Sequence, residues 1–243
     1  MKIIVLNLER SIERRNVMCT RLERLPFEIE FLSAIDGKLL NYDFFPDGTE
    51  RRLAPGEIGT YLSHVKAWQT VVEQNLECAV ILEDDVLLEP SFPSIVNELC
   101  QLDFRWDAIR LSALMPIKGI SLCSLSDGTE LLLPNKNPSG CQGYLVNKPG
   151  AERLISRLSI PLQPIDNAFD RYWKYGLYIP IISPSVVCED RTITSTVPWR
   201  LCEVNKKGMM SHLRRVAEAE LRKIYVFFMA SKVKKKICIN CRS

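Results

Sequence analysis

Apolar residues in this chain fall into short runs of strand length and into stretches with helical spacing. Residues 80–82 are wholly apolar, lead into three consecutive acids, and are followed by a second apolar run at 86–88. Residues 2–8 are nearly all apolar, 28–33 alternate in part, and 11–25 carry a helical apolar stripe. Uninterrupted apolar runs are typical of strands buried on both faces of a sheet. The first 35 residues therefore predict a β-α-β unit that opens a doubly wound sheet.

The later segments alternate between helices and strands as well. Helices are predicted over residues 57–74, 90–102, 148–158 and 164–173, and strands over 106–112, 143–146 and 177–182. Residues 36–56 and 115–137 carry turn signals and are expected to be loop or mixed structure. We therefore predict an α/β fold, in which helices cover both faces of one sheet.

The acids Glu83, Asp84 and Asp85 are the first candidates for chemistry, because they stand where the apolar run 80–82 ends. Open α/β sheets bind their ligands at the carboxyl ends of strands. Adjacent carboxylates repel one another unless a cation lies between them, and Mg²⁺ or Mn²⁺ that also binds substrate phosphate is the usual answer. The alternative is a solvated acidic turn that caps the next helix.

Polar residues also follow the first predicted strand. Asn7, Arg10 and Arg14 stand where a β-α turn would meet phosphate or a base, although no G-x-G-x-x-G is present. A solvated helix face is the alternative for the arginines. Ser63 and His64 are neighbours on a helix and point about 100° apart, so they are poorly placed as a nucleophile and base. We expect His64 to be packed or to contact substrate rather than to bind metal.

Composition is that of a soluble globular protein, with 47% hydrophobic and 25% charged residues among 243. The first ten residues resemble neither a signal peptide nor a membrane span. The nine cysteines follow no spacing framework, and a lone C-x-x-C at 238–241 has no second pair. A reduced, cytosolic compartment is therefore expected.

Charge divides the chain in two. Residues 206–243 hold 11 Lys and Arg against 2 acids, a net of +9, whereas residues 1–205 have a net of −6. Residues 212–236 can form a helix in which Ile224, Phe227 and Phe228 alternate with basic residues, and its apolar centre is too short to span a bilayer. We predict a basic amphipathic helix on an anionic membrane surface. The alternatives are a docked terminal helix and a nucleic-acid-binding arm.

The order of these features resembles glycosyltransferase family 25, over about residues 1–185. The matching blocks are 7–15 (NLERSIERR), 33–37 (SAIDG), 56–68 (GEIGTYLSHVKAW), 81–86 (ILEDDV), 143–145 (GYL), 150–151 (GA) and 164–166 (PID) ahead of Trp173. Residues 189–197 depart, because 194–197 (TSTV) hold no acid where the family often has one. The resemblance implies a GT-A-type, Rossmann-like fold. It also implies inverting transfer of a hexose, most commonly galactose from UDP-galactose, to lipopolysaccharide or lipooligosaccharide.

Roles follow from the resemblance and from the residues together. Asp85, with Asp84 or Glu83, is expected to hold Mn²⁺ or Mg²⁺ against the donor diphosphate. The expected donor contacts are Asn7, Leu8, Arg10, Arg14, Glu57, Ser63, His64 and Asp84. Gly143 and Tyr144 are expected to contact the acceptor. Asp166 is the predicted catalytic base, although it can also be an ordinary helix cap, and Asp170 on the same helix face is the reserve.

The predicted organisation is a glycosyltransferase domain at 1–205 and a basic tail at 206–243. Within the domain, about 1–110 would bind the nucleotide-sugar donor and 111–205 a lipid-linked oligosaccharide, and no nucleic-acid partner is expected. The predicted location is cytoplasmic, on the inner face of a bacterial inner membrane. A metal-dependent nucleotidyl or phosphoryl transferase and a non-catalytic glycan-binding homologue are the alternatives.

Overall fold

The computed structural model describes residues 1–41, 53–192 and 209–240, with the side chains of the last helix described over 216–234. Residues 193–197 of the departing segment lie outside the described residues. Four basic residues of the predicted membrane-binding helix have side chains outside the described range: Arg214, Arg215, Lys235 and Lys236. Among the described helices, none is long and apolar enough to cross a membrane.

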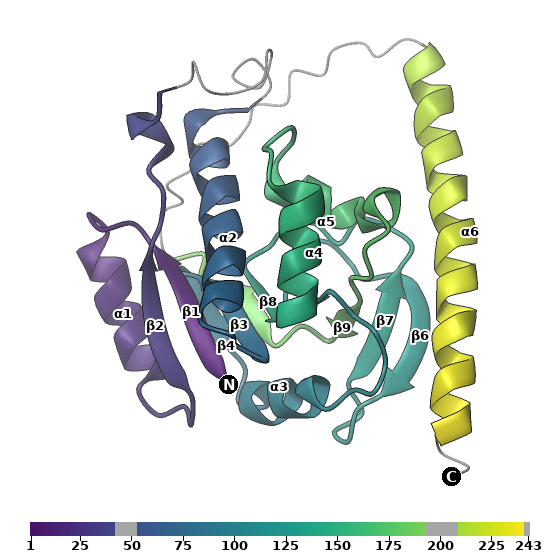
Figure 1. Cartoon of the computed structure of the whole chain (residues 1–243), viewed down its shortest axis with the longest axis horizontal. Helices are drawn as coiled ribbons and strands as arrows, with labels where there is room; N and C mark the ends of the chain where they lie inside the picture. Colours follow the sequence, from purple (N-terminus) through teal and green to yellow (C-terminus); the bar gives the residue numbers. More distant parts are fainter. Residues whose placement is uncertain (42–52, 193–208, 241–243) are drawn as a thin grey trace.

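An eight-stranded sheet crosses the whole molecule in the order β2-β1-β3-β8-β5-β9-β7-β6 (Figure 1). Its strands are β1 Lys2–Asn7, β2 Glu28–Ser33, β3 Cys78–Glu83, β5 Ala108–Arg110, β6 Gly119–Ser124, β7 Glu130–Pro134, β8 Gly143–Asn147 and β9 Ile181–Ser183. A separate pair joins β4 Val86–Leu88 to β10 Val187–Glu189. The helices are α1 Ile12–Leu22, α2 Pro55–Glu73, α3 Phe92–Cys100, α4 Lys148–Leu158, α5 Ile165–Asp170 and α6 Met209–Asn240, with 3-10 turns η1 Gly37–Leu39 and η3 Tyr172–Tyr175.

The sheet is mixed, and its direction changes beside β3. Strands β2, β1 and β3 are parallel, as the β-α-β prediction requires. Strand β8 then runs antiparallel to both β3 and β5. The carboxyl ends of β1 and β3 therefore lie at the same edge as the chain that enters β8, and three segments distant in sequence meet there.

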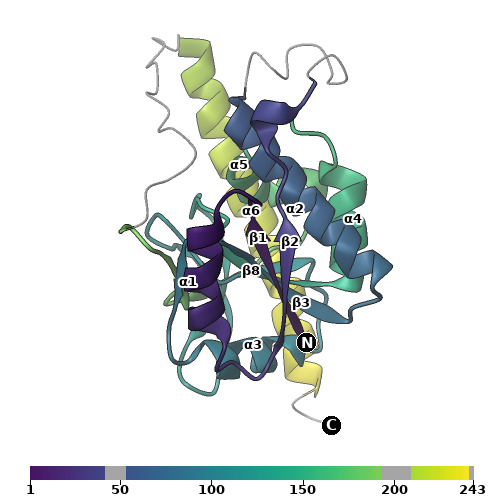
Figure 2. The same cartoon turned by 90° about the vertical axis from the view of Figure 1, so that its left-hand side faces the viewer.

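Helices cover both faces of the sheet, as predicted. Figure 2 shows α1 on one side of β1 and β2, and α2 with α4 on the other. The core strands are buried on both faces, so their apolar runs have no polar alternation: the side chains of Ile3, Ile4, Val80 and Ile81 are wholly buried. The α/β prediction is confirmed.

Two segments differ from the sequence prediction. Residues 115–137, expected to be mixed, contain the β6–β7 hairpin, whose turn places Gly128 at φ 86°. Its strands are short and only half buried, and a half-buried strand with serine and cysteine gives a weak periodic signal. The strand expected at 177–182 is confined to Ile181–Ser183; Leu177, Tyr178 and Ile179 are buried without forming a strand.

Helix α6 packs along the edge of the sheet formed by β6 and β7 (Figure 1). Val226, Ala230 and Val233 face inward and are buried, and the Tyr225 hydroxyl donates to the Leu177 carbonyl at 3.1 Å. On the opposite face Phe227 and Phe228 are each 61% exposed. The basic tail is thus docked on the body through one face and keeps an apolar outer face.

Candidate functional site

A cavity of about 360 Å³ opens at the edge of the sheet where β1 and β3 end. The first turn of α2, residues 140–142 ahead of β8, and the start of α5 complete its walls. The predicted site residues that line it are Leu8, Arg10, Arg14, Glu57, Ser63, Glu83, Asp84, Asp85 and Asp166. These nine residues come from four separate blocks of the sequence and meet in one cavity.

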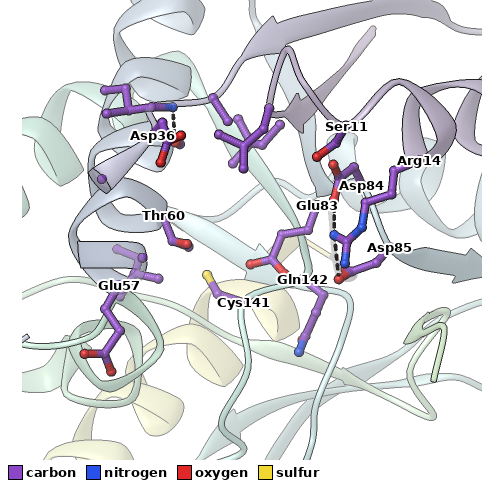
Figure 3. A pocket seen from close by; sticks show the side chains of 18 of the residues that line it. Ser11, Arg14, Asp36, Glu57, Thr60, Glu83, Asp84, Asp85, Cys141 and Gln142 are labelled. Atoms are coloured by element: carbon purple, nitrogen blue, oxygen red, sulfur yellow. Dashed lines mark hydrogen bonds and ion pairs between the residues drawn. The ribbon is translucent and has the colours of Figure 1, made fainter. Parts of the chain in front are cut away.

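The acidic segment forms a tight turn between β3 and β4, and a guanidinium bridges two of its carboxylates (Figure 3). Arg14 Nη1 donates to Asp84 Oδ1 at 2.6 Å and to Asp85 Oδ2 at 3.2 Å. Asn7 Nδ2 donates to the other oxygen of Asp84 at 2.7 Å. The guanidinium of Arg14 therefore supplies part of the positive charge that three adjacent acids require. Together with Asn7 it also fixes the orientation of Asp84.

Asp85 is less completely satisfied than Asp84. Its Oδ1 is buried and accepts no hydrogen bond from the described residues. Burial raises the pKa of Asp85 to about 7, and the neighbouring carboxylates of Glu83, Asp84 and Glu189 add to that rise, while Arg14 opposes it. A buried carboxylate oxygen among like charges is a place where an added cation would be strongly favoured.

The fit of a divalent cation rests on that oxygen. Within the described part of the chain, no three His, Cys, Asp or Glu side chains are already grouped as a metal cage. Mg²⁺ and similar ions are commonly bound by one or two carboxylates and by substrate phosphates, so a cage is not required. Asp85, with Glu83 and Glu189 beside it on the cavity wall, fits this sparser mode of binding.

The opposite wall is the amino-terminal turn of α2, which two glycines bring close to the chain after β2. A Cβ on Gly59 would lie 2.5 Å from the Ile35 carbonyl oxygen, and one on Gly37 would lie 1.6 Å from that of Pro55. Glu57 closes this turn by accepting a hydrogen bond from the Ala54 amide at 2.7 Å. The glycines of the 33–37 and 56–68 blocks therefore have a packing role that sets the width of the cavity.

Four predicted contacts lie behind the cavity rather than on it. Asn7 and His64 are buried, and neither they nor Gly143 and Tyr144 line the cavity. The Tyr144 hydroxyl accepts from Trp68 Nε1 at 2.8 Å and lies 3.0 Å from His64 Nδ1. In this structure Tyr144 cannot touch an acceptor, because its side chain is wholly enclosed. As expected, His64 is packed, and its Nε2 lies 3.7 Å from Glu83 Oε1.

Ser63 and His64 do not form a pair, as their spacing predicts. Ser63 Oγ accepts from the Ile35 amide at 2.8 Å and donates to the Gly59 carbonyl at 2.7 Å. Its hydroxyl ties the chain that follows β2 to α2 at the cavity wall. The predicted role of Ser63 as a donor contact stays a prediction, since the residue lines the cavity.

The two candidate bases are separated by the structure. Asp166 is half buried, lines the cavity, and accepts a hydrogen bond from the Asn167 amide at 2.7 Å. Asp170, one turn later, is buried and pairs with Arg110 at 2.6 Å. Asp170 faces the core, where an acceptor hydroxyl cannot reach it. The prediction of Asp170 as a reserve base is therefore wrong.

Several lining residues were not singled out from the sequence: Asp36, Thr60, Cys141, Gln142 and Glu189. Two of them had a signal, because Thr60 lies three residues after Glu57 on one helix face and Asp36 stands in the 33–37 block. Asp36 pairs with Arg10. Glu189 lies on β10, in the segment where the sequence departs from the family, and only folding brings it beside Asp85.

Open α/β sheets bind their ligands at the carboxyl ends of the strands, and this polar, carboxylate-rich cavity lies there. The sequence model described as "Glycosyltransferase family 25 (LPS biosynthesis protein)" matches residues 1–169. The chain belongs to this family.

Two relatives align with part of the chain by sequence, and one solved structure aligns by fold. A "Glycosyltransferase 25 family member" of Aedes aegypti is 31% identical over 201 residues, which are 74% of this chain and 30% of that protein. "Procollagen galactosyltransferase 2" of Homo sapiens is 27% identical over 63% of this chain and 27% of its own length. A solved glycosyltransferase involved in the glycosylation of the major capsid of PBCV-1 aligns with 91% of this chain and 98% of its own, at 11% identity and a TM-score of 0.45. The chain thus spans less than a third of the length of the two sequence relatives.

Proposed function

We propose that this chain is a metal-dependent hexosyltransferase that moves galactose from UDP-galactose to a glycan hydroxyl with inversion. The observation that carries the proposal is that one cavity is lined by both Asp85, whose Oδ1 accepts no hydrogen bond from the described residues, and Asp166. The human relative is named a galactosyltransferase, and the family membership supports a nucleotide-sugar donor.

The donor is assigned to the half of the cavity formed by β1, α1 and the acidic turn. Leu8, Arg10 and Arg14 line this half, and Ser63 lines the cavity from α2. The role of Asn7 is indirect, because it donates a hydrogen bond to Asp84 and does not line the cavity. Arg14 already bridges Asp84 and Asp85, so it fixes the two carboxylates at the position where the diphosphate would arrive.

Mn²⁺ or Mg²⁺, held by Asp85 with Glu83 and Glu189, would neutralise the donor diphosphate and the charge that develops on the departing UDP. Asp84 is a weaker ligand candidate, because both of its oxygens accept hydrogen bonds. Glu83 is half buried and faces the cavity in Figure 3. This assignment keeps Asp85 as the principal ligand.

Asp166 is the proposed base. A carboxylate at the start of α5 would accept the proton of the acceptor hydroxyl as that oxygen attacks the anomeric carbon. Asp166 lines the same cavity as the acidic turn, from the first turn of α5, so donor and acceptor would meet within one cavity.

The test is a panel of nucleotide sugars, each incubated with the protein in chelator and then in excess Mn²⁺ or Mg²⁺. Metal-stimulated release of UDP is expected with UDP-galactose. Asp85→Asn and Asp166→Asn should each lower turnover at least 100-fold, whereas Glu89→Gln, an exposed carboxylate outside the cavity, should not. Undiminished turnover in chelator would refute the metal role, and near-normal turnover of Asp166→Asn would refute the base.

We propose further that the acceptor is a lipid-linked oligosaccharide at the cytoplasmic face of a bacterial inner membrane. The support is the lipopolysaccharide description of the family and the outer face of α6. Leu221, Ile224, Phe227 and Phe228 are all more than half exposed there. Lys223, Lys232 and Lys234 stand among them, and each cation near an anionic surface contributes about 1 kcal/mol.

Because α6 packs against the edge of the sheet, its proposed attachment to the membrane cannot be tested cleanly by deleting it. Deleting the tail would uncover the sheet edge that Val226 and Ala230 cover, so point variants are the better probe. Phe227→Ser with Phe228→Ser should lower binding to phosphatidylglycerol vesicles at least tenfold and spare transfer to a soluble acceptor. Ile160→Ser with Leu162→Ser is the matched control, because those residues are also half exposed but lie on the body. Equal binding of both double variants, or binding unaffected by salt, would refute the anchor.

A further inference from the structure

The wall of the cavity that carries Asp166 rests on a buried arginine in the middle of the sheet. Arg110, the last residue of β5, is 2% exposed, although its guanidinium is permanently charged. Its Nη1 donates to Asp170 Oδ1 at 2.6 Å, and its Nη2 donates to the Ser139 carbonyl at 2.7 Å and to that of Gly140. One side chain therefore ties a central strand to α5 and to the loop that enters β8.

Both segments held by Arg110 line the cavity. The loop supplies Gly140, Cys141 and Gln142, and α5 supplies Ile165 and Asp166 in its first turn. The loop also reaches the acidic turn, because the Gln142 carbonyl accepts from the Glu83 amide at 2.9 Å. Arg110 is thus connected to Asp166 through α5 and to the acidic turn through the 139–142 loop, and it does not itself line the cavity.

The backbone of this loop has an unusual conformation that a partner must maintain. Ser139 has φ 52° and Gly140 has φ 77°, two successive left-handed residues. A non-glycine residue in that region is strained, and such strain persists only where the surroundings fix it. The two carbonyls that Arg110 binds are those of these two residues, so the guanidinium fork holds the strained turn in place.

We propose that Arg110, with Asp170, is a positioning residue that sets the separation of Asp166 from the acidic turn. This inference rests on the function proposed above. Asp170 serves to orient and neutralise the guanidinium, and the catalytic effect passes through the 139–142 loop and the first turn of α5. The alternative, a buried ion pair that serves stability alone, makes a different prediction for paired substitutions.

The test uses the full chain with Asp170→Leu, Arg110→Met and the two combined. Each single change leaves a buried charge without its partner and should lower the melting temperature sharply, whereas the apolar pair should recover most of the loss. The 140–142 amides of the double variant should still exchange at least tenfold faster than those of the wild-type protein, as measured by hydrogen–deuterium exchange mass spectrometry. Its kcat should stay at least tenfold low, with a smaller change in KM for the donor. Recovery of loop protection and kcat together with stability would overturn the proposal.

Arg110→Lys is the second probe and decides the matter if the double variant does not fold. An ammonium keeps the charge beside Asp170 but lacks the planar fork that reaches both carbonyls. Near-native melting with a faster-exchanging loop and lower kcat is expected, and wild-type exchange and kcat would overturn the proposal. If the wild-type protein transferred no sugar, the proposed function would fail, while loop exchange would still report on positioning.

Discussion

Neutralising Asp85 should stabilise the metal-free protein while it destroys the proposed activity. Asp85→Asn keeps the shape of the side chain and removes a charge that lies among Glu83, Asp84 and Glu189. The folded-state pKa of about 7 exceeds the ordinary value of 3.8, so the folded protein retains a proton that the unfolded chain has lost. The free energy of unfolding therefore falls as pH rises from about 4 to about 7 and stays low above that range.

The magnitude follows from the width of that interval. Three pKa units correspond to a loss of ~4 kcal/mol in the free energy of unfolding at pH 8. The asparagine variant would recover at most this amount. In a chain of this size that is a rise in melting temperature of roughly 10 °C. Calorimetry in chelator at pH 5 and pH 8 is the assay, with Glu89→Gln as the exposed control.

Two results would contradict this reasoning. One is a wild-type melting temperature that does not fall between pH 5 and pH 8 relative to Asp85→Asn. The other is an asparagine variant no more stable than wild type at pH 8. Added Mn²⁺ should raise the wild-type melting temperature at pH 8 and leave that of the variant unchanged, because only the carboxylate would bind the ion.

Two further predictions concern the residues behind the cavity. Tyr144→Phe removes the hydroxyl that contacts Trp68 Nε1 and His64 Nδ1, so the free energy of unfolding measured by chemical denaturation should fall by ~2 kcal/mol. The kcat should change less than fivefold. A loss of activity with unchanged stability would contradict the packed role. In Gly59→Ala the new Cβ would lie 2.6 Å from the Gly37 amide nitrogen, so the protein should be destabilised by ~2 kcal/mol or more. UDP binding, measured by calorimetry, should also weaken. Wild-type stability and wild-type UDP binding would show that the cavity wall tolerates the shift.

The sequence predicted the elements whose signal is local. The strand at 28–33 and the helix at 148–158 have the predicted bounds, because partial alternation and a helical apolar stripe are complete within each segment. The direction of β8 was not predictable in this way. Pairing direction depends on segments distant in sequence, and an apolar strand looks the same whether it runs parallel or antiparallel to its neighbour.

The candidate site shows the same division. Residues in the family-like blocks were gathered at the strand ends, as expected, since the carboxyl edge of a sheet is set by topology. The family-like block favoured Asp166, but the helix pattern alone could not separate it from Asp170, because both were expected on one helix face. Only the pairing with Arg110, 60 residues before Asp170, holds Asp170 in the core. Nor could it show that Arg14 lies between two of the acids, which is a contact across 70 residues.

The pairing of β8 with β3 also restricts how the chain can vary in length. Gly143 lies opposite Leu82, and a Cβ at that position would come within 2.7 Å of Val187 Cγ1. Inserting or deleting one residue within 143–147 would shift the register, turn the Tyr144 ring to the other face of the sheet, and bring a bulky side chain against Val187. The turn at Gly128 is different, because nothing lies within 4 Å of a Cβ built there. In a library of one-residue insertions, survivors should gather at that turn and be missing from β8, so the position of length changes among functional variants would map the register of the sheet.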